Sequence, residues 1–312
     1  MNEFRKYLEG RNFLPQTIYI SIKYVENFFM WSKTEAEQVT EPDILRYLEH
    51  LKNNKNVKNN TRQHHLFALK HYFSCLLQNG QIDKNPCNLL KIRGQKRKTL
   101  YKIYTPEELE TLCDNYYHVF VRNFDNSRIS EHQRHQINLK MNRNALILSI
   151  LTNQGATANE FDKIEVGDVD LIKATLKIRG GRQSNERTIP LKATQIGLFM
   201  HYLQNIRPQL LEYQTQESNK LFLPLPKGNQ KKIENDMLLS TFNKLIKQVK
   251  SIDNQFINFK QVRASLITFW LKTQGLRKAQ YLAGHRFISS TENYLENNLD
   301  GLIDDINKLH PF

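Results

Sequence analysis

Three residues near the C-terminal end of the chain have types and spacing that suit phosphodiester chemistry without a metal. They occur in order as Lys260-Gln-Val-Arg263, then Gly284-His285, and then Tyr294, nine residues after the histidine. An arginine can hold two phosphate oxygens at once, and a histidine can donate to them or help to move a proton. A tyrosine can attack phosphorus and stay attached, but its phenol, with a pKa of about 10, needs a base or a cationic field beside it.

The surroundings of these residues resemble a known family. The stretch Ala283-Gly-His-Arg-Phe-Ile-Ser-Ser-Thr-Glu-Asn-Tyr294 is similar to the C-terminal signature of the tyrosine recombinases, the phage-integrase family, which is close to Leu-Gly-His-x-x-x-x-x-Thr-x-x-Tyr. Arg263 lies in a segment that looks like the family's His-x-Leu-Arg-His box. The resemblance implies that Tyr294 is the nucleophile, that His285 assists at the scissile phosphate, and that Arg263 holds the phosphate oxygens.

Three positions depart from the family pattern. Lys260 stands where the box usually opens with histidine, and Arg182 stands at a hairpin tip where the family carries a lysine that protonates the leaving 5′ oxygen. We keep both in the predicted catalytic set as sources of positive charge, although arginine is a poor proton donor. Thr157 occupies the position of the family's first arginine, so it is a degenerate catalytic position. Glu160, which often orients the family's arginines, is retained, and another cation is expected beside it, with Arg143 and Lys260 as candidates.

The composition points to a polyanionic partner. The chain has 312 residues, a net charge of +14 and an isoelectric point near 9.5. Charge of this size favours a nucleic acid as the partner, although a soluble basic protein is the simpler alternative. Cys75, Cys87 and Cys113 have no paired metal spacing, so we expect a reduced cytoplasmic protein, associated with the bacterial nucleoid, that needs no metal or cofactor. No apolar run is long enough to cross a bilayer, and the first residues do not look like a signal peptide.

Apolar spacing predicts that the first ~90 residues are helical. Thr40-Glu-Pro-Asp43 has the features of a helix start, residues 61–77 follow a helical pattern, and Asn79-Gly80 would end that helix. This pattern resembles the family's helical DNA core-binding domain over residues 1–90. Residues 91–103 form a basic linker in which Arg93, Lys96, Arg97 and Lys98 are candidate DNA contacts; a solvated charge run is the alternative.

Residues 104–312 would form the catalytic recombinase domain. A cap at Thr105 opens a helical region that runs to about residue 160, with a polar interruption over 122–135. Alternating strands at 176–179 and 187–191 predict a hairpin, and helices are expected near 193–213, 235–250 and 260–274. The fold class is therefore mostly α (α+β), with an N-terminal helical bundle and a mainly helical catalytic domain that contains a small antiparallel sheet. An apolar face within 301–309 predicts a tail that packs on a neighbouring protomer, as in the family, or on its own domain.

Three functions follow from these observations. The first is a site-specific DNA recombinase that cleaves and rejoins strands through a 3′-phosphotyrosine intermediate, for a mobile element. The second is a DNA-binding accessory protein of the same fold with weak or lost catalysis, as the altered positions Thr157, Arg182 and Lys260 suggest. The third is an unrelated helical nucleic-acid binder in which Tyr294 has no role. The resemblance implies double-stranded DNA as partner and a homotetramer on paired sites, allows for accessory DNA-bending proteins, and implies no membrane.

Overall fold

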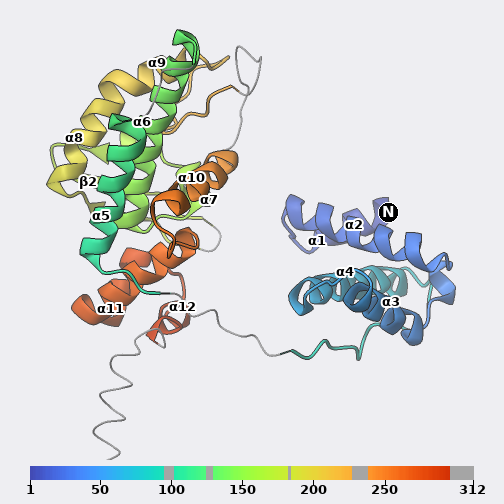
Figure 1. The fold of residues 1–312 in the computed structure, drawn as a ribbon. Coiled ribbons are helices and arrows are strands. Elements are labelled where there is room, and N and C mark those ends of the chain that lie inside the picture. The colour runs from blue at the N-terminus through green and yellow to red at the C-terminus, as the bar shows by residue number, and fades with distance from the viewer. Residues whose placement is uncertain (95–101, 124–128, 182–183, 227–237, 296–312) are drawn as a thin grey trace, which may run out of the picture. The chain divides into compact units, whose positions relative to one another are not determined.

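The computed structural model describes residues 1–94, 102–123, 129–181, 184–226 and 238–295. The chain divides into two compact units, Met1–Lys98 and Thr99–Phe312, each with its own apolar core. Helices dominate both units, and the second also holds one small sheet (Figure 1). The predicted mostly helical fold with a small antiparallel sheet is confirmed.

The N-terminal unit is built from amphipathic helices that bury aromatic and aliphatic side chains between them. Its helices are α1 (Asn2–Gly10), α2 (Pro15–Ser32), the short 3-10 helix η1 (Ala36–Gln38), α3 (Glu41–Asn53) and α4 (Asn59–Gln78). Thr40 caps α3 as predicted: its backbone N–H donates to the Asp43 carboxylate at 2.9 Å. Gly80, with φ +69°, follows the end of α4, which confirms the predicted stop.

The second unit packs its helices around a core that also covers one face of the sheet. Its helical elements are α5 (Pro106–Tyr116), the π-helix η2 (Tyr117–Arg122), α6 (Glu131–Gln154), α7 (Ala158–Phe161), the 3-10 helix η3 (Val166–Asp168), α8 (Ala193–His201), the π-helix η4 (Tyr202–Ile206), α9 (Arg207–Leu211), α10 (Leu239–Ile252), α11 (Phe259–Ala283) and α12 (Ser289–Glu292). A capping box at Thr105 opens α5, as predicted.

The sheet has three antiparallel strands in the order β1 (Val169–Asp170), β2 (Thr175–Ile178) and β3 (Arg187–Pro190). The predicted hairpin is confirmed, and Ile178 pairs with Arg187 at the end next to its loop. Because side chains alternate along a strand, Arg187 shares the buried face of β3 with Ile189. The two-residue strand β1 was not predicted, since it is too short to show alternation.

Two helices extend beyond the predicted bounds. The polar stretch expected to interrupt the helices already contains the start of α6 at Glu131, which Ser130 caps together with Gln133. The helix that begins at Phe259 resumes after a break at Gly275 (φ +77°) and runs on to Ala283. The polar residues at the start of α6 are helical because the cap at Ser130 and the packing of the later turns stabilise the helix despite their low intrinsic tendency to form one.

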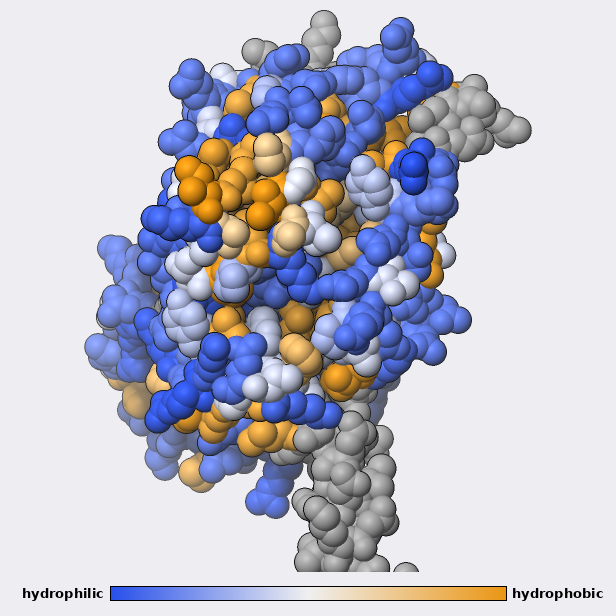
Figure 2. Space-filling model, turned by 90° about the vertical axis from the view of Figure 1, so that its left-hand side faces the viewer, coloured by the Kyte–Doolittle hydropathy of each residue, from blue (hydrophilic) through white to orange (hydrophobic). Residues whose placement is uncertain are grey.

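The surface shown in Figure 2 is mainly hydrophilic, with apolar residues in several separate patches. Within the described ranges, no helix is long and apolar enough to cross a membrane. The same ranges contain no group of three or more His, Cys, Asp or Glu side chains that could hold a metal ion.

Candidate active site

Both ends of α11 and the turn after it bring Arg263 and His285 together. Gly284 ends the helix in the left-handed region at φ +66°, which turns the chain into His285. Arg263 donates from Nη2 to the carbonyl oxygen of Ala283 at 2.5 Å, and from Nη1 to the carbonyl oxygen of Gly155 at the end of α6. The guanidinium is therefore fixed beside the turn that carries the histidine.

His285 and Tyr294 face each other across the short helix α12. Nδ1 of His285 lies 2.9 Å from Oγ1 of Thr291, a fully buried residue of α12. The backbone N–H of Tyr294 donates to the carbonyl oxygen of Thr291 at 2.9 Å. The His285 and Tyr294 rings are stacked with centroids 5.8 Å apart and an interplanar angle of 19°. Thr291 thus contacts the imidazole through its hydroxyl and the backbone of Tyr294 through its carbonyl oxygen.

The electrostatic environment keeps the imidazole neutral. Burial, followed by the charges of Arg263 and Arg187, lowers the pKa of His285 to about 4. Burial and the charge of Arg187 also lower the pKa of Arg263, while Glu160 and a hydrogen bond with Tyr294 act in the opposite direction. At neutral pH the site therefore presents a cationic guanidinium and an uncharged imidazole next to the tyrosine.

Thr157 has a structural use in place of the expected arginine. It is the N-cap of α7, and both its backbone N–H and its hydroxyl donate to Oε2 of Glu160, at 2.7 and 3.0 Å. The Glu160 carboxylate is buried. A buried carboxylate needs a cationic partner, and Thr157 cannot supply one.

The cation beside Glu160 is Arg187, a residue that the sequence analysis missed. Nη1 of Arg187 lies 2.6 Å from Oε1 of Glu160, and Nη2 lies 3.2 Å from Oε2. Both side chains are almost fully buried, at 0% and 4% exposure. Burial alone would raise the pKa of Glu160, but the hydrogen bonds and charge of Arg187 hold it below its ordinary value. The inward position of Arg187 on an alternating strand was the signal that could have found it.

Arg187 also lies against the turn that carries His285. A Cβ atom at Gly284 would come within 2.4 Å of Nη1 of Arg187, so the close approach requires glycine there. The backbone N–H of Asn185 donates to the carbonyl oxygen of Gly284 at 2.9 Å, and Ser184 forms an antiparallel bridge with His285. The end of the hairpin is thereby joined to the Gly284–His285 turn.

A cation does lie beside Glu160, but neither of the two predicted candidates pairs with it, so that choice of residues was wrong. Arg143 is buried between α6 and α10, where Nη1 donates to the carbonyl oxygen of Leu223 at 2.8 Å. Lys260 lies in the first turn of α11 with an exposed side chain, and no hydrogen bond or ion pair joins that side chain to another described residue. Its catalytic role stays a prediction.

Several predicted positions lie outside the described residues. They are Arg182 at the hairpin tip, Lys96, Arg97 and Lys98 in the linker, and the tail after Leu295. Arg93 is described and exposed, and its carbonyl oxygen accepts a hydrogen bond from the Asn59 amide at 3.4 Å. The DNA contacts assigned to these basic residues therefore stay predictions.

Comparison with known proteins reveals relatives that match nearly the whole chain. The chain is 27% identical over 316 residues to "Tyrosine recombinase XerC" of Natranaerobius thermophilus, covering 99% of this chain and 97% of the relative. It is 31% identical over 172 residues to "Tyrosine recombinase XerD" of Staphylococcus haemolyticus, covering 54% and 55% of the two chains.

Solved structures share the fold at lower identity. The XerH site-specific recombinase bound to a palindromic difH substrate matches with a TM-score of 0.65 and 17% identity, over 94% of this chain and 78% of that one. The Tn1549 transposon integrase in complex with circular intermediate DNA matches with a TM-score of 0.64 and 16% identity, over 94% of both chains.

Two family models account for most of the sequence. The model "Phage integrase, N-terminal SAM-like domain" matches residues 1–83, and the model "Phage integrase family" matches residues 123–300. The second match includes Glu160, Arg187, Arg263, His285 and Tyr294, the residues that the structure brings together. The chain therefore belongs to the phage integrase family of tyrosine recombinases.

Proposed function

We propose that this protein is an active site-specific DNA recombinase that cleaves and rejoins strands through Tyr294. The observation that carries the proposal is the convergence of Arg263, His285 and Tyr294 next to the buried Arg187–Glu160 pair. A guanidinium, an imidazole and a phenol in contact are the groups that a metal-independent phosphoryl transfer needs.

The proposed reaction conserves the energy of the phosphodiester bond. The phenolic oxygen of Tyr294 attacks the scissile phosphorus and loses its proton, while the bond to the 5′ oxygen breaks and that oxygen takes up a proton. The product is a 3′-phosphotyrosine and a free 5′-hydroxyl. A 5′-hydroxyl from a second duplex then reverses the step and releases Tyr294, so no cofactor is consumed.

Each side chain has a role that fits its surroundings. Arg263 holds non-bridging oxygens of the phosphate through guanidinium donors. His285, being neutral, either accepts the phenolic proton or donates to a phosphate oxygen, depending on its tautomer. Lys260 and Arg182 add positive charge at the substrate phosphate. Arg187 is a positioning residue, because its buried guanidinium acts through Glu160 and the His285 turn.

The substrate and assembly follow from the same proposal. Double-stranded DNA fits the net charge of +14 and the basic linker that includes Arg93. A homotetramer on paired sites would bring two duplexes together for strand exchange, and accessory bending proteins would help to shape them. We propose that the recombinase acts on a mobile element, in the cytoplasm of a bacterium.

A covalent-trapping assay tests the proposal. Purified protein is incubated with nicked duplexes taken from DNA that flanks its own gene, and the products are separated on a denaturing gel. We expect a slow-migrating protein–DNA adduct that Tyr294→Phe abolishes without loss of DNA binding. The control Tyr117→Phe changes an exposed tyrosine and should keep the adduct. An adduct that survives Tyr294→Phe would remove this residue from the mechanism.

A catalytically weak accessory protein is the second candidate. The engaged Thr157 favours it, since the family's first arginine is absent there and its loss costs about 10²–10³ in rate. This candidate would be supported over the first if the protein bound its DNA sequence-specifically but formed no adduct on nicked substrates. The adduct should remain absent when a related active recombinase is added.

A further inference from the structure

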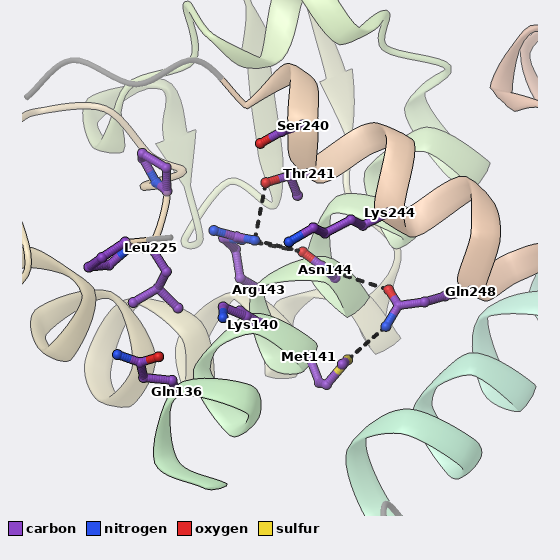
Figure 3. A pocket seen from close by; sticks show the side chains of 12 residues that line it. Gln136, Lys140, Met141, Arg143, Asn144, Leu225, Ser240, Thr241, Lys244 and Gln248 are labelled. Carbon is purple, nitrogen blue, oxygen red and sulfur yellow. Dashed lines mark hydrogen bonds between the residues drawn. The ribbon is translucent and has the colours of Figure 1, made fainter. Parts of the chain in front are cut away.

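A pocket of about 220 Å³ lies between α6, α10 and residues 224–226 (Figure 3), and none of the residues assigned to catalysis is among the described residues that line it. Three of the side chains that line it are cationic: Lys140 and Arg143 from α6, and Lys244 from α10. Its other polar groups include the hydroxyls of Ser240 and Thr241 in the first turn of α10. Such a set of donors recognises an anion.

The guanidinium of Arg143 is buried with only neutral oxygens as partners. Nη1 donates to the carbonyl oxygen of Leu223 at 2.8 Å, while Nη2 donates to Asn144 at 3.1 Å and to Thr241 at 3.3 Å. Burial lowers the pKa of Arg143, which marks the cost of holding this charge away from water. An anion in the pocket would offset that cost.

The two lysines add charge that the described residues leave unbalanced. Burial, followed by the charges of Lys244 and Arg143, lowers the pKa of Lys140. None of the three cations forms an ion pair with a carboxylate within the described ranges. Figure 3 shows Lys244 extending toward Arg143 across the pocket. The positive charges of these side chains repel one another, and a counter-ion between them would remove that repulsion.

We propose that this pocket binds a phosphate group of the DNA backbone at a point separate from the scissile phosphate. A phosphate offers several oxygens to three cations and two hydroxyls at once. The apolar wall formed by Leu225, Pro224 and Pro226 suits the adjoining deoxyribose. This inference rests on the proposed function for its source of phosphate, namely duplex DNA.

Salt-dependent binding tests the inference independently of cleavage. All variants carry Tyr294→Phe, so that failure of the chemistry cannot affect the result, and the ligand is a duplex of arbitrary sequence. Each phosphate contact steepens the fall of log K with log salt by about one unit. We expect Lys140→Gln and Lys244→Gln each to flatten this slope. Because both lysines contact the same phosphate, the double variant should flatten it by about one unit in total. Both substitutions relieve repulsion, so the melting temperature should not fall.

Lys247→Gln is the matched control, since Lys247 is an exposed lysine of α10 that does not line the pocket. It should leave the slope of the Tyr294→Phe protein almost unchanged. An equal change in the control, or no change in the pocket variants, would overturn the inference. Calorimetry with inorganic phosphate separates the sources: binding of free phosphate that Lys140→Gln abolishes, with an unaltered DNA slope, would assign the pocket to a small anion and overturn its assignment to DNA.

Discussion

Arg187 and Glu160 form a two-point ion pair inside the catalytic unit, with nitrogen–oxygen distances of 2.6 and 3.2 Å. The pair links α7, whose N-cap Thr157 occupies the position of a missing arginine, to the Gly284–His285 turn. It therefore explains why the chain retains a buried carboxylate at 160 without a cation at 157. The positive charge is supplied from β3 instead.

Removing the Arg187 charge should destabilise the fold as well as the site. Arg187→Gln leaves Glu160 buried without a cation, and breaking a buried pair from one side typically costs about 3–5 kcal/mol. Chemical denaturation at neutral pH measures this loss. Arg179→Gln is the matched control, because Arg179 also binds carboxylates, Glu165 and Asp168, but is 37% exposed. If the two substitutions cost the same, burial of the Arg187 pair is not what matters.

Placing an arginine at position 157 should have different effects in the natural chain and in the Arg187→Gln variant. In the natural chain, Thr157→Arg adds a second cation next to Glu160 and removes the Thr157 hydroxyl, so we expect no gain in covalent adduct. In the Arg187→Gln background, the same change restores a partner for Glu160, so stability and adduct formation should recover together.

The two backgrounds distinguish substitution from simple addition of charge. A rise in adduct with Thr157→Arg alone would show that Arg187 does not compensate for the missing arginine. Failure to recover in the double variant, with the protein folded, would show that a guanidinium entering from α7 cannot reach the same carboxylate. Gel quantification of the adduct and a melting curve give both readings for each protein.

The sequence was sufficient to predict the elements that carry the site, but not the pair at its centre. His285 and Tyr294 are only nine residues apart, so their spacing brings them close together. Arg263 meets them because α11 breaks at Gly275 and its second part brings Ala283 back to the Arg263 guanidinium. Arg187 lies 27 residues after Glu160 and meets it only because the hairpin docks on the turn at Gly284. That docking depends on tertiary packing, which local spacing does not report.

Arg143 shows the opposite error. Arg143 lies on α6, before Thr157 in the sequence, and was therefore considered as a partner for Glu160. A helix rises about 1.5 Å per residue, so a residue several turns before the end of α6 lies in another part of the molecule. The structure places it against Leu223 and Thr241. A correct assignment required knowing which helix packs on that turn of α6.

Acid should weaken the contribution of Glu160. Its pKa is lowered from 4.5 in the folded protein, so its stabilisation is fully present above pH 4.5 and is lost as the pH falls through the lower, folded value. The difference in unfolding free energy between the natural protein and Glu160→Gln should therefore shrink as the pH drops below 4.5. Glu110→Gln, which removes an exposed carboxylate, is the control. A difference that stays constant across this range would contradict the pairing.

Titration of His285 should report directly on the charge of Arg187. Burial, Arg263 and Arg187 together lower the pKa of His285 to about 4, so the folded protein favours the neutral imidazole. The folded state therefore loses stability as the pH falls below 6.5, where the histidine of the unfolded chain takes up a proton. Arg187→Gln removes one of the two cations and should raise this pKa, with the imidazole signals followed by NMR and assigned with His285→Asn. Adding Thr157→Arg should lower it again.

His65 provides the internal control for that titration. Its pKa is also lowered to about 4, but mainly by burial in the N-terminal unit, with a smaller contribution from His64. Arg187→Gln should leave it unchanged, because that unit has a separate core. A parallel rise of both histidines would indicate general loosening of the protein, whereas a rise of His285 alone would show that Arg187 sets the electrostatic field at the residue facing Tyr294.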